Sequence, residues 1–307
     1  MGRYVIRRLL QMIPVFIGAT LLIFLMVNVM GDPIAGLCGD RSCDPATAAQ
    51  LRSEFGLDKP LWQQYLTYLG NIFTGDFGTA FNGQPVTELM GSAFPVTIRL
   101  TIVAIVFEIV IGITLGVITG LRRGRPVDTG VLLFTLIVIS VPTFVTGLLL
   151  QLLLGVKWGW IQPSVSSEAT FGELIVPGLV LASVSLAYVT RLTRTSIAEN
   201  RRSDYVRTAV AKGLPRRRVT IRHLLRNSLI PVVTFIGTDI GALMGGAIVT
   251  ERIFNIHGVG YQLYQGILRQ NTQTVVGFVT VLVLVFLVAN LLVDLLYAVL
   301  DPRIRYA

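Results

Sequence analysis

Charged residues are scarce in this chain. Only 14% of its 307 residues are Asp, Glu, Lys or Arg, whereas 53% are hydrophobic, and the mean hydropathy is +0.70. A soluble domain usually carries about 25% charged residues, so the sequence does not have enough charge to cover a soluble surface of this size. The composition predicts a protein whose main solvent is lipid.

Lysine, histidine and cysteine are also rare, and this scarcity excludes several kinds of chemistry. None of the three lysines follows a glycine, so the chain lacks the Gly-Lys-Ser/Thr sequence of a P-loop ATP site. It also lacks a His-Glu-x-x-His helix, a nucleophile elbow and a Rossmann glycine fingerprint. We therefore predict that this chain holds no metal or cofactor and catalyses no reaction by itself.

Long apolar runs are what the chain does contain. A helix needs about 20 mostly apolar residues to cross a bilayer, and six runs match this requirement, although the fourth is short and contains Pro177 and Gly178. The first run exceeds the core of a signal peptide, so we expect a retained helix. The composition and these runs predict an all-α membrane protein with six transmembrane helices. They span residues 9–30, 97–121, 131–156, 174–188, 228–250 and 274–300.

The net charge of +9 is distributed unevenly between the loops. By position, 19 of the 26 basic residues lie near the N-terminus, around residues 122–125, between residues 191 and 226, and in the tail. The segment 31–96 holds three basic and seven acidic residues. Basic loops remain on the cytoplasmic side, so both termini are predicted to be cytoplasmic. The charge then reflects membrane topology, and no nucleic-acid partner is expected.

The predicted spans and the charges of the loops divide the chain into four parts. Residues 1–30 form an N-terminal segment with the first helix, and residues 31–96 form an extracytoplasmic segment with short helices. Residues 97–300 form a five-helix core with a cytoplasmic loop at 191–227, and residues 301–307 form a cytoplasmic tail.

The extracytoplasmic segment contains signals for two helices. Asp44-Pro45 predicts the start of one that ends near residue 55, and a second begins near Pro60. The second helix has an apolar face, which we expect to pack on the spans rather than to dock an external partner. Cys38 and Cys43 lie in the same segment, where the compartment permits a disulfide. A disulfide and two free thiols both remain open.

The basic loop contains a short amphipathic helix. Ser203 or Asp204 can cap its start, and Gly213 can end it. Its apolar face can lie in the lipid interface or in a groove of a partner protein, and the spacing leaves both open. The apolar face consists of Tyr205, Val206, Ala209 and Val210, and the polar face of Asp204, Arg207, Thr208 and Lys212.

Three acidic residues, Glu108, Asp239 and Asp294, fall inside apolar runs. Each costs roughly 2.5–3.5 kcal/mol at the centre of a lipid-facing helix, so we expect them to face a polar cavity, an internal hydrogen-bond network or another subunit. Asp294 is close enough to the cytoplasmic end to reach the interface. For Glu108 and Asp239, a place in a translocation path and a structural hydrogen bond both remain open.

Glycines repeat at intervals of four in the second and fifth runs. Small residues at this spacing let helix backbones approach closely, so we predict helix-packing ridges. Prolines within or beside the spans, among them Pro142, can bend them. The ridges consist of Gly112, Gly116, Gly120, Gly237, Gly241 and Gly245.

Several motifs resemble the permease subunits of peptide-type ABC importers. Residues 204–214, followed by 222–231, resemble the coupling loop of that family. Similar likenesses occur at residues 75–78, at 251–254 with 258–260, and at 296–306. The chain departs from the general importer motif Glu-Ala-Ala-x-x-x-Gly, since only Ala209 and Gly213 match it.

The resemblance implies the type I ABC importer permease fold in a bacterial cytoplasmic membrane. Such a chain pairs with a second, homologous permease and with two cytoplasmic ATPase subunits, which carry ATP and Mg. An extracytoplasmic binding protein delivers the cargo. The coupling helix would sit in a cleft of one ATPase. Its residues would be Asp204, Tyr205, Val206, Arg207, Ala209, Val210 and Gly213.

The resemblance favours short peptides as cargo and leaves nickel complexes and haem as alternatives. Two other classes compete with the importer hypothesis: a stand-alone ion-coupled transporter, in which Glu108 and Asp239 would bind ions or protons, and a membrane scaffold.

Overall fold

The computed structural model of the chain describes residues 2–30, 44–54, 58–80 and 83–300. Within these residues the regular structure is helical, with one isolated bridge between Thr79 and Pro85. The all-α prediction is therefore confirmed for the described part of the chain. Cys38, Cys43 and the tail 301–307 lie outside the described residues, so the statements about them remain predictions.

The helices that are long and apolar enough to cross a membrane number five, or six if one bent pair counts as a single span. The bent pair is Pro126–Ser140 with Thr143–Lys157, which meet at 97°. The five are Val5–Met26, Val86–Leu121, Ile175–Asn200, Ile230–Phe254 and Thr272–Leu295.

The bent pair covers the predicted run over residues 131–156, and the bend falls at Pro142, where the sequence permits one. Val141 is extended, with φ −93° and ψ 123°, and Pro142 follows it. A residue before proline is disfavoured in the helical region, and proline has no N–H to donate. The chain therefore turns at this point, and hydropathy alone could not show the direction of the second arm.

The chain divides into two compact units. Unit 1 consists of Met1–Thr97, His257–Leu291 and Pro302–Ala307, and unit 2 of Ile98–Ile256 and Leu292–Asp301. In unit 1 the elements are α1 (Gly2–Met30), α2 (Pro45–Glu54), α3 (Leu61–Thr74), the start of α4 (Val86–Phe107), α13 (Val259–Leu268) and most of α14 (Thr272–Leu300).

In unit 1, α3 packs through tyrosines. Tyr65 lies 3.0 Å from the hydroxyl of Thr20 on α1, Tyr68 hydrogen-bonds Thr280 on α14, and Phe24 contacts both tyrosine rings. The predicted packing of the apolar face is only partly correct, because several of its large side chains remain exposed. These are Leu61, Trp62, Leu66 and Phe73, the last at 84%.

A glycine-bounded turn follows α3. Gly75 and Gly78 both have positive φ, at +75° and +76°, a region that side-chain-bearing residues rarely adopt. The amide of Gly78 donates to Asp76 Oδ1 at 2.9 Å, which closes a local Asx turn. The amide of Thr79 donates to the Gln273 side chain at 2.8 Å, so the turn is tied to the start of α14.

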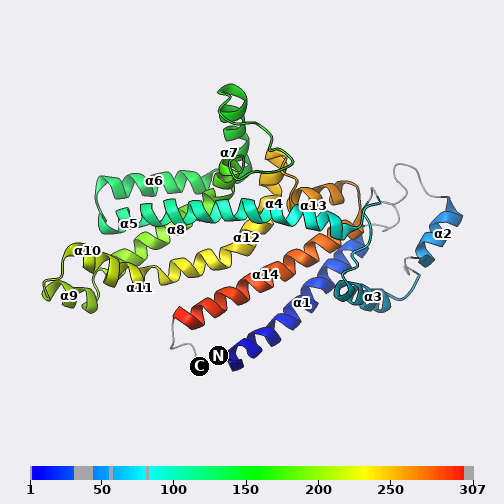
Figure 1. Ribbon diagram of the computed structural model, residues 1–307, viewed down its shortest axis with the longest axis horizontal. Helices are drawn as coiled ribbons and strands as arrows, with labels where there is room; N and C mark the ends of the chain where they lie inside the picture. The colour runs from blue at the N-terminus through cyan, green and yellow to red at the C-terminus, as the bar shows by residue number, and fades with distance from the viewer. Residues whose placement is uncertain (1, 31–43, 55–57, 81–82, 301–307) are drawn as a thin grey trace. The chain divides into compact units, whose positions relative to one another are not determined.

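In unit 2, α8 (Ile175–Asn200) is the central helix and contacts α5, α6, α7 and α12 (Figure 1). It is longer than the predicted run 174–188, because apolar counting stops before Arg191 although the helix continues. The remaining elements are η1 (Glu108–Gly112), α5 (Ile113–Leu121), α6 (Pro126–Ser140), α7 (Thr143–Leu150), η2 (Gln151–Lys157), α9 (Asp204–Ala211), α10 (Arg216–Arg218), η3 (Val219–Leu225), α11 (Arg226–Ser228) and α12 (Ile230–Phe254).

The loop between η2 and α8 is held by Glu173. Its carboxylate accepts hydrogen bonds from the backbone and side chains of Ser166 and Thr170, at 2.8–3.2 Å. These donors, led by those of Thr170, lower the pKa of Glu173 to about 2. The loop is also tied to α12, because the amide of Val165 donates to the Phe254 carbonyl at 2.9 Å.

Candidate functional site

The short helix α9 lies at the end of unit 2 where α8 finishes and α10 begins (Figure 1). It starts after Ser203 and ends before Gly213, which has φ +71°. The amide of Gly213 donates to the Val210 carbonyl at 2.9 Å, and the amide of Leu214 donates to the Ala209 carbonyl at 3.3 Å. This left-handed turn reverses the chain so that η3 can return toward α12.

The apolar face of α9 is divided between two environments. Val206 and Ala209 are buried and pack with Ile197, Val219 and Leu224 of the same chain. Sequence analysis weighed only lipid and a partner protein, so it missed this third environment. Tyr205 and Val210 remain exposed, at 37% and 61%. Only this half of the face is available to an external partner.

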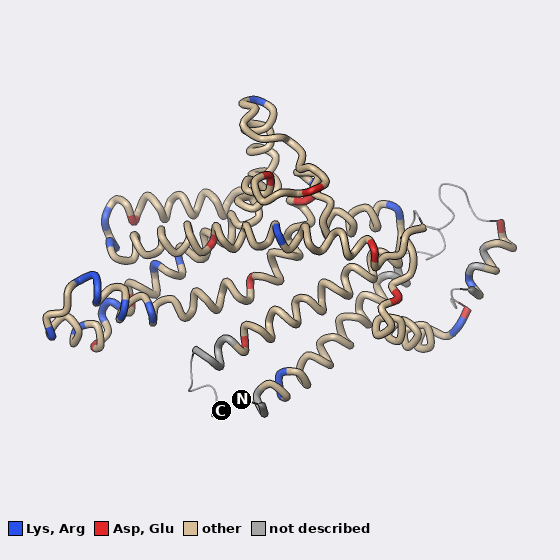
Figure 2. The backbone as a smooth tube through the Cα atoms, viewed as in Figure 1, with Lys and Arg blue, Asp and Glu red and all other residues tan. Residues whose placement is uncertain are grey.

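The polar face of α9 is fully open. Asp204 and Arg207 form an ion pair with an Nη1–Oδ1 distance of 3.6 Å, and their side chains are 97% and 76% exposed. Such a pair contributes little to stability, so both charges are free to meet other groups. Figure 2 shows that Lys and Arg residues of unit 2 gather at this end.

The base of α9 is tied to the ends of the spans. Ser196 on α8 donates to the Ser228 carbonyl at 2.8 Å, which joins α8 to the start of α12. Arg201 donates to the Leu121 carbonyl at 2.9 Å, which joins the end of α8 to the end of α5. These two hydrogen bonds thus join the neighbouring ends of three spans, α5, α8 and α12.

An ion pair that sequence analysis missed holds α6 on α8. Arg194 binds Asp128 with two nitrogens, and its Nη2 lies 2.8 Å from Oδ2. The Asp128 side chain is 3% exposed and also accepts the Gly124 amide at 2.8 Å. Two features of the sequence could have predicted this ion pair. Arg194 continues the helical pattern beyond the apolar run of α8, and Asp128 follows the basic segment 122–125.

Glu108 and Asp239 come together inside unit 2. Asp239 on α12 interacts with Ser185 on α8 and with Glu108, which begins the π-helical segment η1. Glu108 is fully buried. By distance and angle, neither of its carboxylate oxygens completes a hydrogen bond within the described residues. A carboxyl pair with one fully buried member, at a π-helical turn, is a strong functional candidate.

The first glycine ridge lies against α8. A Cβ on Gly112, Gly116 or Gly120 would come within 2.4–2.9 Å of a side chain on that helix. The side chains are those of Val189, Thr193 and Ile197, which share the same four-residue spacing. The two backbones therefore approach closely along this whole contact.

The second glycine series behaves differently. A Cβ on Gly237 would lie 2.6 Å from Val293 Cγ2, whereas a Cβ on Gly245 would meet nothing within 4 Å. Gly241 is half-buried. Gly237 thus lies in a tight contact within the chain, whereas Gly245 does not.

The described side chains do not form a metal-binding site. Within the described residues, no group of three or more His, Cys, Asp or Glu side chains could hold a metal ion. The candidate functional surfaces are the segment around α9 and the carboxyl pair.

Two family matches cover the sequence. Residues 112–306 match the family described as binding-protein-dependent transport system inner membrane component, and residues 1–101 match the N-terminal region of the membrane component of such systems. The chain belongs to this permease family. It is a multi-pass subunit of the cytoplasmic membrane, and it acts with a substrate-binding protein and an ATPase.

Relatives of the permease match it along its whole length. The dipeptide transport permease DppB of Escherichia coli K12 is 38% identical over 337 aligned residues, which cover 100% of this chain and 99% of the relative. The oligopeptide permease AppB of Bacillus subtilis is 36% identical, with both chains fully covered. The glutathione permease GsiC of Pectobacterium atrosepticum is 38% identical, again with full coverage.

Proposed function

We propose that this permease imports di- or oligopeptides into the cytoplasm, driven by ATP hydrolysis on partner subunits. The observation that carries the proposal is full-length similarity to permeases named for dipeptides, oligopeptides and glutathione. All three cargoes are short peptides. Nickel complexes and haem are the alternative cargoes, and competition for uptake against labelled dipeptide distinguishes them.

We further propose the assembly around the permease. A second, homologous permease completes the membrane part, two ATPases carry ATP and Mg, and an extracytoplasmic binding protein delivers the peptide. The permease itself holds no cofactor and catalyses no reaction. The distribution of basic residues along the sequence supports a cytoplasmic location for α9 and both termini, since basic loops stay on that side.

In this assembly α9 acts as the coupling helix. Tyr205 and Val210 enter a cleft of one ATPase, while Val206 and Ala209 hold α9 on its own chain. ATPase closure then moves α9 as a lever. Because the anchoring residue Ile197 belongs to α8 and Leu224 precedes α12, the movement reaches both spans and changes access to the pathway.

The exposed half of α9 gives the sharpest test. Substitutions at Ala209 would disturb the chain's own packing, whereas Val210→Asp changes a side chain that is 61% exposed. We expect this variant to lose at least tenfold in ATP-driven dipeptide uptake while its membrane insertion is unchanged. The matched control is Thr208→Asp, on the polar face of the same helix, which should retain uptake.

Normal uptake by the Val210→Asp variant would exclude the lever role of α9. Uptake by the purified chain alone, driven by an ion gradient without ATP, would instead support an ion-coupled transporter. Both measurements use the full-length chain in proteoliposomes, with and without the ATPases.

We also place Glu108 and Asp239 in the translocation path. The variants Glu108→Gln and Asp239→Asn keep the shape of each side chain and remove its charge. If the pair acts in transport, uptake should fall while the thermal stability of the permease stays equal or rises. A loss of stability with unchanged uptake per folded molecule would assign the pair a structural role.

A further inference from the structure

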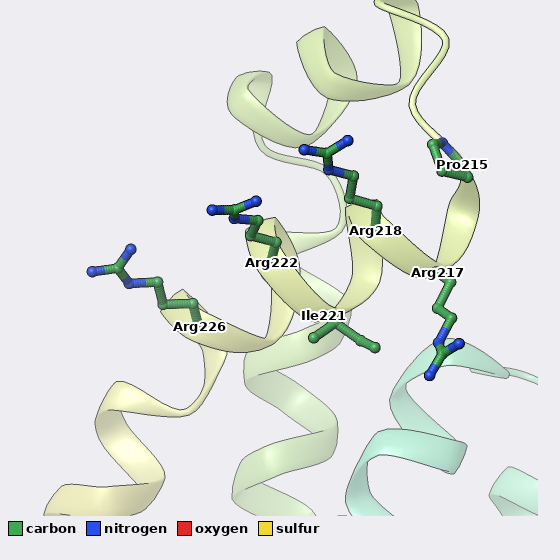
Figure 3. Close-up of a pocket in the computed structure, with 6 residues that line it drawn as sticks. All are labelled: Pro215, Arg217, Arg218, Ile221, Arg222 and Arg226. Atoms are coloured by element: carbon green, nitrogen blue, oxygen red, sulfur yellow. The ribbon is translucent and has the colours of Figure 1, made fainter.

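A row of arginines follows the helical segment that leads from α9 back to the membrane. Arg218, Arg222 and Arg226 are spaced by four residues, and Figure 3 shows their side chains projecting to the same side. They border a shallow hollow of about 620 Å³. Its other lining residues are Pro215, Arg217 and Ile221.

Among the described residues, no acidic side chain forms an ion pair with this row. The ion pairs of Arg194 and Arg207 lie elsewhere in the described part of the chain, and the three row arginines are all exposed. Guanidinium groups bind phosphate through two parallel hydrogen bonds. Three of them in one row present the donors that a phosphate-bearing anion requires.

The position of the row beside a membrane span indicates where this anion comes from. Only Leu229 separates α11 from the span α12, and the hydrogen bond from Ser196 to Ser228 sets Arg226 beside the end of α8. Arg201, at that same end of α8, bonds the last residue of α5, Leu121. Arg226 therefore lies level with the ends of three spans.

The other two arginines lie farther from the spans. Arg222 lies in η3 and Arg218 at the end of α10, one and two steps of four residues farther along the chain from α12. The row therefore begins beside a span and leads away from it, which is the usual position of a basic cluster that meets lipid headgroups.

We propose that Arg218, Arg222 and Arg226 form a binding site for the phosphate headgroup of an anionic phospholipid. Basic clusters at the cytoplasmic end of membrane helices attract anionic lipids. The site is separate from the exposed residues of α9 that face the ATPase, so it does not depend on the cargo or on the coupling mechanism.

The test measures binding of fluorescent phosphatidylglycerol to the full-length permease in zwitterionic detergent. Each arginine near an anionic lipid surface strengthens binding by roughly fivefold. The variant Arg218→Gln/Arg222→Gln/Arg226→Gln should therefore bind roughly 100-fold more weakly. The matched control Arg122→Gln/Arg202→Gln/Arg216→Gln removes three exposed arginines outside the hollow, so its loss of binding should be about tenfold smaller than that of the row variant.

The single variant Arg222→Gln, at an exposed side chain, keeps the test valid if the triple variant does not fold. It should bind roughly fivefold more weakly. Equal losses in the control triple variant, or unchanged binding in both row variants, would overturn the proposal.

Further measurements distinguish an anionic lipid from a free anion or a protein partner as the ligand of this site. Phosphatidylcholine should bind at least tenfold more weakly than phosphatidylglycerol, and inorganic phosphate should displace the lipid only at millimolar concentration. Displacement by phosphate at the concentration of the lipid itself would assign the site to a free anion instead. Loss of ATPase copurification with unchanged lipid binding would assign it to a protein partner.

Discussion

Replacing Gly116 with alanine would test the close contact between α5 and α8. A Cβ at this position would lie 2.4 Å from Thr193 Cβ and 2.7 Å from the Thr190 carbonyl oxygen. Carbon atoms in good contact are about 3.5–4.0 Å apart, so the helices must separate by about 1 Å. The Thr190 oxygen belongs to the backbone, so unlike a side chain it cannot rotate away from the added methyl group.

The expected change in the free energy of unfolding follows from two opposing effects. Overpacking of this kind costs about 1–3 kcal/mol, whereas alanine favours a helix over glycine by about 1 kcal/mol. Gly130→Ala is the matched control, because a Cβ on Gly130 in α6 meets nothing within 4 Å. Subtracting the two variants cancels the helix propensity and leaves the packing cost.

Denaturation of the full-length permease in detergent, followed by circular dichroism, measures this difference. Gly116→Ala should be less stable than Gly130→Ala by about 1–3 kcal/mol. Equal or greater stability of Gly116→Ala would refute the close contact.

A second-site change sharpens the Gly116 test. Thr193→Ala should not rescue Gly116→Ala, since the nearest atom is the Cβ that alanine retains. Thr193→Gly should rescue it only in part, because the Thr190 oxygen remains.

Three further changes test other contacts. Arg194→Ala leaves the buried Asp128 carboxylate unpaired and should cost about 3–5 kcal/mol in the same denaturation assay; an effect no larger than that of the exposed Arg191→Ala would contradict this. Glu173 has a pKa lowered to about 2, so its stabilisation is complete above its ordinary value of 4.5 and is lost as pH falls toward 2. The difference in melting temperature between wild type and Glu173→Gln should therefore shrink as pH falls from 6 to 3, and a constant difference would exclude the carboxylate as its cause. Tyr68→Phe removes the hydrogen bond to Thr280, which also bonds the Val276 carbonyl at 2.7 Å, so it should cost only about 0.5–1 kcal/mol; a loss above 2 kcal/mol in the same assay would show that more than this bond is at stake.

Local signals in the sequence were enough to place several elements. The limits of α9 follow from a polar residue at its start and a glycine after its end, both of which act on the neighbouring backbone. The spans follow from hydropathy, because every crossing segment must be apolar. Helical spacing also predicted the close-packing glycine ridge on α5, although it did not identify α8 as the partner.

Packing partners distant in the sequence decided the rest. The direction of the arm after Pro142, the pairing of Arg194 with Asp128, and the meeting of Glu108 with Asp239 each depend on how separate helices lie together.

The sequence by itself determined that this chain is a helical membrane permease with a short amphipathic helix in its most basic loop. Only the tertiary structure decided which half of that helix is free. Val206 and Ala209 are buried because residues from α8 and η3 pack against them, while Tyr205 and Val210 remain exposed. Periodicity assigns all four to one face, since it reports the direction of a side chain along its own helix. Burial depends on what the rest of the chain brings to that face.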